Sequence, residues 1–80
     1  MRAMYGGAVA TLQRAMYGGA VATLQRAIRV KPDYVAAHWL LGMSWLRLGE
    51  KEKALRVYKD LLKLDKKQAD DLHEEISKSK

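Results

Sequence analysis

The chain has 80 residues, 49% of them apolar, and 15 basic against nine acidic residues give it a formal net charge of +6. This length fits one domain with little room for a second, and the apolar fraction excludes a disordered tail. Because the chain has no cysteine, disulfides and thiolate–metal sites are excluded as stabilising elements, which is compatible with the cytoplasm, where we expect the protein.

The first element of the chain is a perfect tandem duplication. Residues 2–13 read RAMYGGAVATLQ, and residues 14–25 read the same. The copies have not diverged, so the duplication is either very recent or deliberately introduced, and we favour deliberate introduction. Only the second copy continues into a segment with apolar residues at helical spacing, namely Ala20, Val21, Leu24, Ala27 and Ile28. The first copy is therefore interpreted as the inserted one.

The length of the duplicated unit limits how the two copies can pack. Twelve residues make about three helical turns plus a third of a turn, so two copies in one helix cannot share a buried face. Either the chain turns within residues 15–19, or one long helix buries its first half against another chain. Gly18 and Gly19 weaken a helix by about 1 kcal/mol each relative to alanine, which favours a turn there. Whether residues 3–30 form one helix or two stays open at this point.

A second helix is predicted after the only proline of the chain. The presence of just one proline and the lack of phenylalanine favour a helical fold over a β-sandwich. Pro32 ends the preceding helix, and Asp33 is predicted to cap the next one over about residues 34–48. Gly49 follows, as is typical just past a helix end.

The last part of the chain predicts two more helices. Glu50 or Lys51 begins the first, and its apolar residues have the spacing of a one-sided amphipathic helix: Ala54, Val57, Tyr58, Leu61 and Leu62. Residues 65–68 break this pattern. A final, polar helix is then marked by Ala69, Leu72 and Ile76.

Small and aromatic residues recur in these helices in a fixed order. In one helix Leu41 precedes Gly42, Trp45 follows, and Gly49 marks the turn to the next helix, which carries Ala54 and Tyr58. The positions about 34 residues earlier fill the second-helix sites of a preceding unit: Tyr17, Ala20, Leu24, Ala27 and Pro32. This order resembles the tetratricopeptide repeat, a unit of about 34 residues. The resemblance implies an all-α fold of antiparallel helical hairpins with a C-terminal capping helix.

The resemblance also divides the chain, although two positions depart from it. It makes residues 2–13 a poor copy of a first inner helix, 14–33 the second helix of that repeat, 34–66 a full repeat and 67–80 a capping helix. Lys66 stands where a proline is expected, as is common where an array ends, and His38 stands where the family often has tryptophan.

One face of the second predicted helix is the candidate binding surface. It carries an apolar stripe with one cation beside it, made of Ala36, Trp39, Met43, Leu46 and Arg47. In the family resembled, this face lines a concave groove that receives peptides; alternatively it is core beneath a neighbouring helix. Related domains that hold acidic chaperone tails have Lys and Asn where Trp39 and Met43 stand. We therefore expect the partner bound at this surface to be an apolar helix, or a second copy of this chain.

Other functions find little support in the sequence. His38 and His73 lack the spacing of a metal site, the acids on the last helix suit a solvated first turn, and no catalytic residue or cofactor is expected. The basic residues are dispersed, which speaks against nucleic acid, and no apolar stretch reaches the roughly 18 residues of a membrane span. We expect a homodimer, exchanged through the duplicated segment, with a monomeric peptide-binding module as the alternative.

Overall fold

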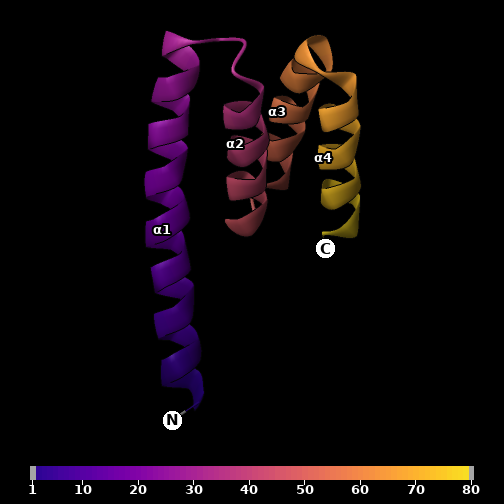
Figure 1. The fold of residues 1–80 in the computed structure, drawn as a ribbon. Coiled ribbons are helices and arrows are strands. Elements are labelled where there is room, and N and C mark those ends of the chain that lie inside the picture. Colours follow the sequence, from indigo (N-terminus) through magenta and orange to yellow (C-terminus); the bar gives the residue numbers. More distant parts are fainter. Residues whose placement is uncertain (1, 80) are drawn as a thin grey trace.

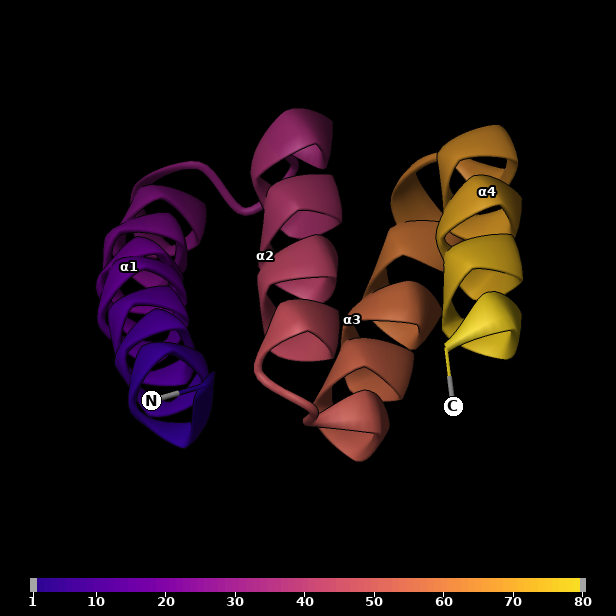
Figure 2. The same ribbon diagram turned by 90° about the horizontal axis from the view of Figure 1, so that it is seen from below.

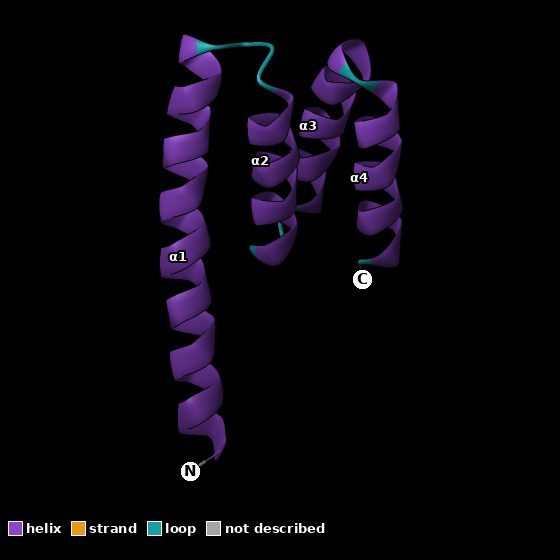
Figure 3. Cartoon of the chain, in the orientation of Figure 1, coloured by secondary structure: helices purple, strands orange, loops and turns teal. Residues whose placement is uncertain are grey.

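Four α-helices make up the part of the chain that the structure describes. The computed structural model describes the backbone of residues 2–79 and the side chains of residues 16–79. The helices are α1 (Arg2–Val30), α2 (Val35–Arg47), α3 (Lys51–Leu64) and α4 (Lys66–Lys78), and the described backbone contains no strand (Figure 1; Figure 3). The predicted all-α fold is confirmed.

The helices lie side by side in chain order, and each runs opposite to the one before it (Figure 1; Figure 2). α2 packs between α1 and α3, and α4 packs on α3 while also contacting α2. Their facing stripes form one core, whose buried members are Val21, Leu41, Ala54, Val57, Leu61, Ala69, Leu72 and Ile76. These are residues that the helical spacing marked as apolar faces, although Leu62, expected among them, is 37% exposed.

Gly42 allows a close contact between α2 and α4. A Cβ atom at this position would lie 2.6 Å and 2.9 Å from the two methyl groups of Leu72, which is itself 0% exposed. Any residue with a Cβ atom would therefore force the buried Leu72 side chain to shift, and glycine avoids this cost.

The turn between α2 and α3 depends on Gly49. Its φ of +78° lies in the left-handed region, which side chains with a Cβ disfavour. The amide of Gly49 donates to the carbonyl of Leu46 (3.0 Å), and that of Glu50 donates to the carbonyl of Trp45 (2.8 Å). This pair of bonds is the Schellman arrangement, which satisfies the last carbonyls of α2 and reverses the chain.

The starts of α2 and α4 differ from the sequence prediction. Asp33 was expected to cap α2, but the cap position is Tyr34, which makes no side-chain capping bond. The reason is a tight turn over residues 31–34, closed by the Tyr34 amide on the Lys31 carbonyl (3.1 Å), which places Asp33 one residue too early. Likewise the break predicted over residues 65–68 is the single residue Asp65, whose carboxylate accepts from the Gln68 amide (3.2 Å) and caps α4.

α1 is one continuous helix of 29 residues, so the turn favoured at Gly18 and Gly19 does not occur. Each glycine destabilises the helix only modestly relative to alanine, whereas a turn would remove several backbone hydrogen bonds of the helix. The half of α1 nearest the N-terminus extends well past the ends of the other helices (Figure 1). The second predicted alternative, a single long helix, is therefore the one observed; the side chains of the inserted copy, residues 2–13, lie outside the described ones.

Replacing Gly18 and Gly19 together by alanine should raise the free energy of unfolding by about 1–2 kcal/mol. A Cβ atom at either position would meet nothing within 4 Å, so only the helix propensity changes. Thermal unfolding followed by circular dichroism measures the effect. The matched control is Gly49→Ala, which should destabilise because of its positive φ. Lower stability of the double variant would contradict a continuous α1.

Candidate functional site

The five residues of the predicted binding surface lie on α2 with unequal exposure. Ala36 and Arg47 are exposed, whereas Trp39, Met43 and Leu46 are half-buried and pack against the core. The stripe therefore combines both sequence interpretations: its inner atoms complete the core, and its outer atoms remain accessible.

A shallow groove between α2 and α4 brings three of the five together. Met43, Leu46 and Arg47 line one side of this space of about 230 Å³, and the other side consists of Glu75, Lys78 and Ser79 from α4. Ala36 and Trp39 do not line it. Met43 and Leu46 contribute the apolar part of a lining that is mostly polar, and the Lys78 ammonium pairs with Glu74 (3.5 Å) and Glu75 (3.6 Å) on the α4 side. The groove therefore offers both apolar and charged contacts to whatever enters it.

Leu40 belongs to the same face, although it was not among the predicted residues. It is 51% exposed and follows Ala36 by one helical turn, so Ala36, Leu40, Met43 and Arg47 make a single line along α2. The helical spacing could have identified this leucine, because it continues the stripe at i, i+4, i+7 and i+11.

A second apolar surface lies on α1 near its C-terminal end. A depression of about 480 Å³ is lined by Thr23, Arg26, Ala27, Val30, Lys31 and Tyr34, and the exposed atoms that line it are apolar. Val30 is 83% exposed and Tyr34 is 45% exposed. Met16, further back on the same helix, is 68% exposed. Three large apolar side chains of this region are thus left open to solvent within one chain.

The histidines and acids occupy structural positions. The Nε2 atom of buried His38 donates to the Pro32 carbonyl (2.8 Å) and so holds the turn before α2. The ring of His73 lies 4.9 Å from that of Tyr58. Among residues whose side chains the structure describes, no three His, Asp or Glu side chains lie together as a metal site would need. No helix in the described part of the chain is long and apolar enough to cross a membrane.

Comparison with known proteins gives one match. The family model described as tetratricopeptide repeat matches residues 5–69. This stretch begins inside the first copy of the duplication and ends in α4. No curated protein and no solved structure matches the chain.

Proposed function

The chain belongs to the tetratricopeptide repeat family, and on this premise we propose that it is a non-enzymatic scaffold that associates with a second copy of itself. Repeats of this family mediate protein–protein interaction. The proposed binding surface is the apolar face of α2, with Ala36, Trp39, Met43, Leu46 and Arg47, together with the duplicated segment of α1. A cytoplasmic protein without cofactor, and without nucleic-acid or membrane partners, is part of this proposal.

The observation that carries the proposal is the length of α1. Its 29 residues span about 43 Å, whereas α2 has 13 residues and spans about 20 Å. Half of α1 therefore has no helix of its own chain beside it (Figure 1). An isolated helix of a dozen residues is marginal in water, so a partner that packs on it would stabilise it.

A monomeric peptide-binding module is the second candidate, and the groove between α2 and α4 favours it. Met43 and Leu46 give this groove apolar contacts, and Arg47 gives it a charged one, so the apolar and the polar face of an amphipathic helix could both be bound there. Because Met43 and Leu46 are only half-buried, this groove is accessible without any rearrangement of the fold.

The mass in solution over a dilution series separates the two candidates. Self-association predicts a dimer at micromolar concentration that dissociates on dilution. A Trp45→Phe background isolates the fluorescence of Trp39, which should shift to longer wavelength as the dimer dissociates. A chain that stays monomeric throughout, yet shifts the Trp39 emission with an added amphipathic peptide, would replace self-association by the second candidate.

Deletion of residues 2–13 is the direct control for the duplication. If the inserted copy drives association, the shortened chain should be monomeric at concentrations where the full chain is dimeric. A dimer of unchanged affinity would show that the duplication is not its cause.

A further inference from the structure

The exposed stripe of α1 corresponds to the most deeply buried face of α3. One repeat of about 34 residues relates Ala20, Thr23 and Ala27 of α1 to Ala54, Val57 and Leu61 of α3. In α3, which packs against both α2 and α4, these residues are 0%, 6% and 0% exposed. In α1 Thr23 is exposed, while Ala20 and Ala27 are half-buried. This stripe of α1 is thus the surface on which an inner helix would pack, and we call it the seat. No helix of the described chain covers it.

The segment that belongs on this seat is residues 2–13. By the same spacing these residues correspond to α2, and the family match begins inside them, at residue 5. To reach the seat within one chain they would have to fold back on α1. They cannot do so here, because α1 is continuous and carries them away from it (Figure 1).

The residue at the hinge explains why the chain does not fold back. The turn that folds α2 onto α3 needs Gly49 at a φ of +78°. One repeat earlier the corresponding residue is Ala15, within the sequence Arg14-Ala15-Met16. Alanine disfavours the left-handed region, whereas it is the best residue for continuing a helix. The duplication has therefore put helix-forming sequence where the second repeat has its turn.

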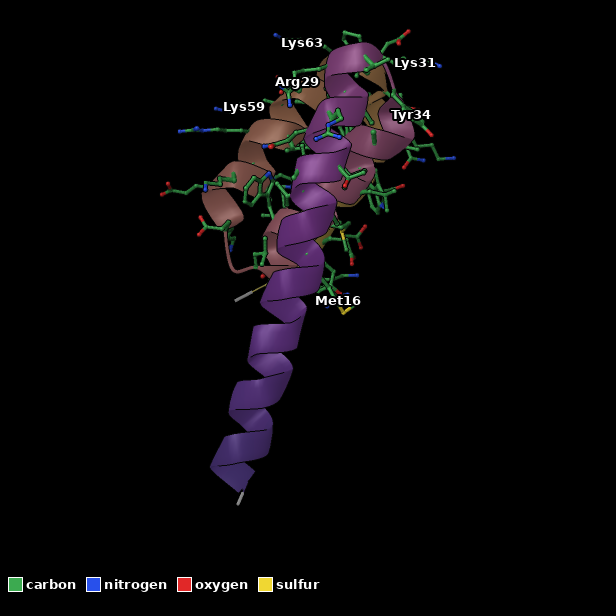
Figure 4. The ribbon with its side chains drawn as sticks, turned by 90° about the vertical axis from the view of Figure 1, so that its left-hand side faces the viewer. Met16, Arg29, Lys31, Tyr34, Lys59 and Lys63 are labelled. Carbon is green, nitrogen blue, oxygen red and sulfur yellow. The ribbon has the colours of Figure 1, made fainter. Side chains whose placement is uncertain are left out.

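We propose that residues 2–13 of a second copy fill this seat, in a reciprocal exchange between two antiparallel α1 helices. This inference rests on the proposed self-association and adds the register in which the two α1 helices pair. The midpoints of α2 and α3, moved back by one repeat, fall near residues 7 and 23. In the antiparallel pair, residue 7 of one α1 therefore lies opposite residue 23 of the other. The two helices then cross halfway between these positions, at residues 15–16. Met16 then lies at the two-fold axis. Its side chain and Tyr34 are on the same side of α1, away from Arg29 and Lys59 (Figure 4).

The seat has the chemistry of an intra-repeat contact. Small residues at Ala20 and Ala27 permit close helix approach, Met16 and Val30 add exposed apolar surface, and Tyr34 closes the end of the stripe. Reciprocity fills two such seats at once, as a two-fold interface requires. The exchange thereby covers the apolar side chains that each separate chain leaves exposed.

Charge opposes this dimer, which gives it a diagnostic salt dependence. Residues 1–31 contain Arg2, Arg14, Arg26, Arg29 and Lys31 and no acidic residue. Two such helices side by side repel one another, and added salt screens the repulsion. We therefore expect the dimer to tighten roughly threefold or more between about 0.05 and 0.5 M NaCl. An association with an acidic partner would weaken instead, so a dimer that loosens with salt would count against this pairing.

Single cysteines test the register, because the native chain has none. Met16→Cys should form a covalent dimer with a thiol-reactive linker of roughly 8 Å, the spacing of packed helix axes. Val30→Cys is the matched control: in the proposed pairing its two copies lie about 43 Å apart and should not react. Both positions are exposed within one chain, so neither change should disturb the fold.

Charge substitutions test the seat itself. Thr23→Glu places a carboxylate where the partner helix should pack and should raise the dissociation constant of the dimer at least tenfold. Ala22→Glu is its neighbour on the same helix, also exposed, and corresponds to the exposed Arg56 of α3. It should change the constant by less than about threefold, since it adds the same charge outside the seat.

The outcomes distinguish this inference from the function on which it rests. Selective linkage at Met16 with a selective loss at Thr23→Glu supports the exchange. A dimer that links as readily at Val30, or that ignores Thr23→Glu, overturns the register while self-association stands. A chain that is monomeric at every concentration overturns both.

Discussion

Replacing Leu61 by alanine is expected to lower the free energy of unfolding by about 2–5 kcal/mol. Leu61 is 0% exposed and belongs to the core cluster that joins the helices. Truncation removes its apolar contacts and leaves a cavity that the tightly packed α2 and α4 cannot fully close. Small domains have total stabilities near the low end of about 5–15 kcal/mol, so the variant should lie close to its unfolding threshold. Urea unfolding followed by circular dichroism measures the loss.

Leu62→Ala provides the control for this truncation. It is the same chemical change, one residue further along α3, at a side chain that is 37% exposed. We expect a loss of less than about 1 kcal/mol, because most of the removed surface was already in contact with water. Equal losses at the two positions would mean that α3 presents a different face to α2 from the one described.

The sequence predicted most of α2, α3 and α4 because local and long-range signals agree there. Gly42 is required by its contact with Leu72, Gly49 by its positive φ, and Ala54 by its complete burial. Each of these residues is specified within the repeat or by the helix that packs directly on it. A repeat whose elements pack only on their neighbours leaves this pattern in a short stretch of sequence.

The path of α1 could not be predicted in the same way. Gly18 and Gly19 are weak helix formers, yet their intrinsic cost is smaller than the cost of breaking the helix around them. The decisive residue is Ala15, whose meaning appears only when it is compared with Gly49 in the other turn. Helix propensities describe a residue in an average helix. The chain here adopts one of two specific paths, a continuous α1 or a helix that turns back on itself, and propensities alone do not distinguish them.

The candidate surfaces were only partly predictable, since exposure depends on which helices are present to cover them. Met43, Leu46 and Arg47 of the proposed binding surface line a groove whose other side is Glu75, an acid expected in a solvated first turn, with Lys78 and Ser79, for which the sequence predicted no role. Val30 and Met16 were missed as surface features. Their counterparts one repeat later, Glu50 and Leu64, are exposed as well, so comparison with the second repeat does not predict burial at these two positions.

Transplanting the second repeat's turn into α1 should convert the dimer into a folded-back monomer. The variant Ala15→Gly with Met16→Glu reproduces Gly49-Glu50 at the corresponding position. Residues 2–13 should then pack on the seat of their own chain. X-ray scattering should show a shape shorter than the 47 Å of the native chain, and the dissociation constant of the dimer should rise at least tenfold.

Two single variants separate the turn from its side effects. Met16→Glu alone removes the apolar side chain at the proposed crossing point without creating a turn. Ala22→Gly carries the same helix cost of about 1 kcal/mol at an exposed position away from the hinge. Neither should shorten the chain. If the double variant keeps the extended shape and the dimer affinity of the native chain, the hinge does not control the exchange.

The size of the effect follows from a competition between packing within one chain and packing between two. A short linker holds residues 2–13 at an effective concentration of the order of millimolar, which at about 1 µM protein favours the fold-back by roughly 4 kcal/mol. The native hinge opposes this with several lost backbone bonds of about 1 kcal/mol each and a further 1–2 kcal/mol for Ala15 in the left-handed region. These terms nearly cancel. A single glycine at position 15 removes one of them, so the same surfaces that join two chains would then close within one.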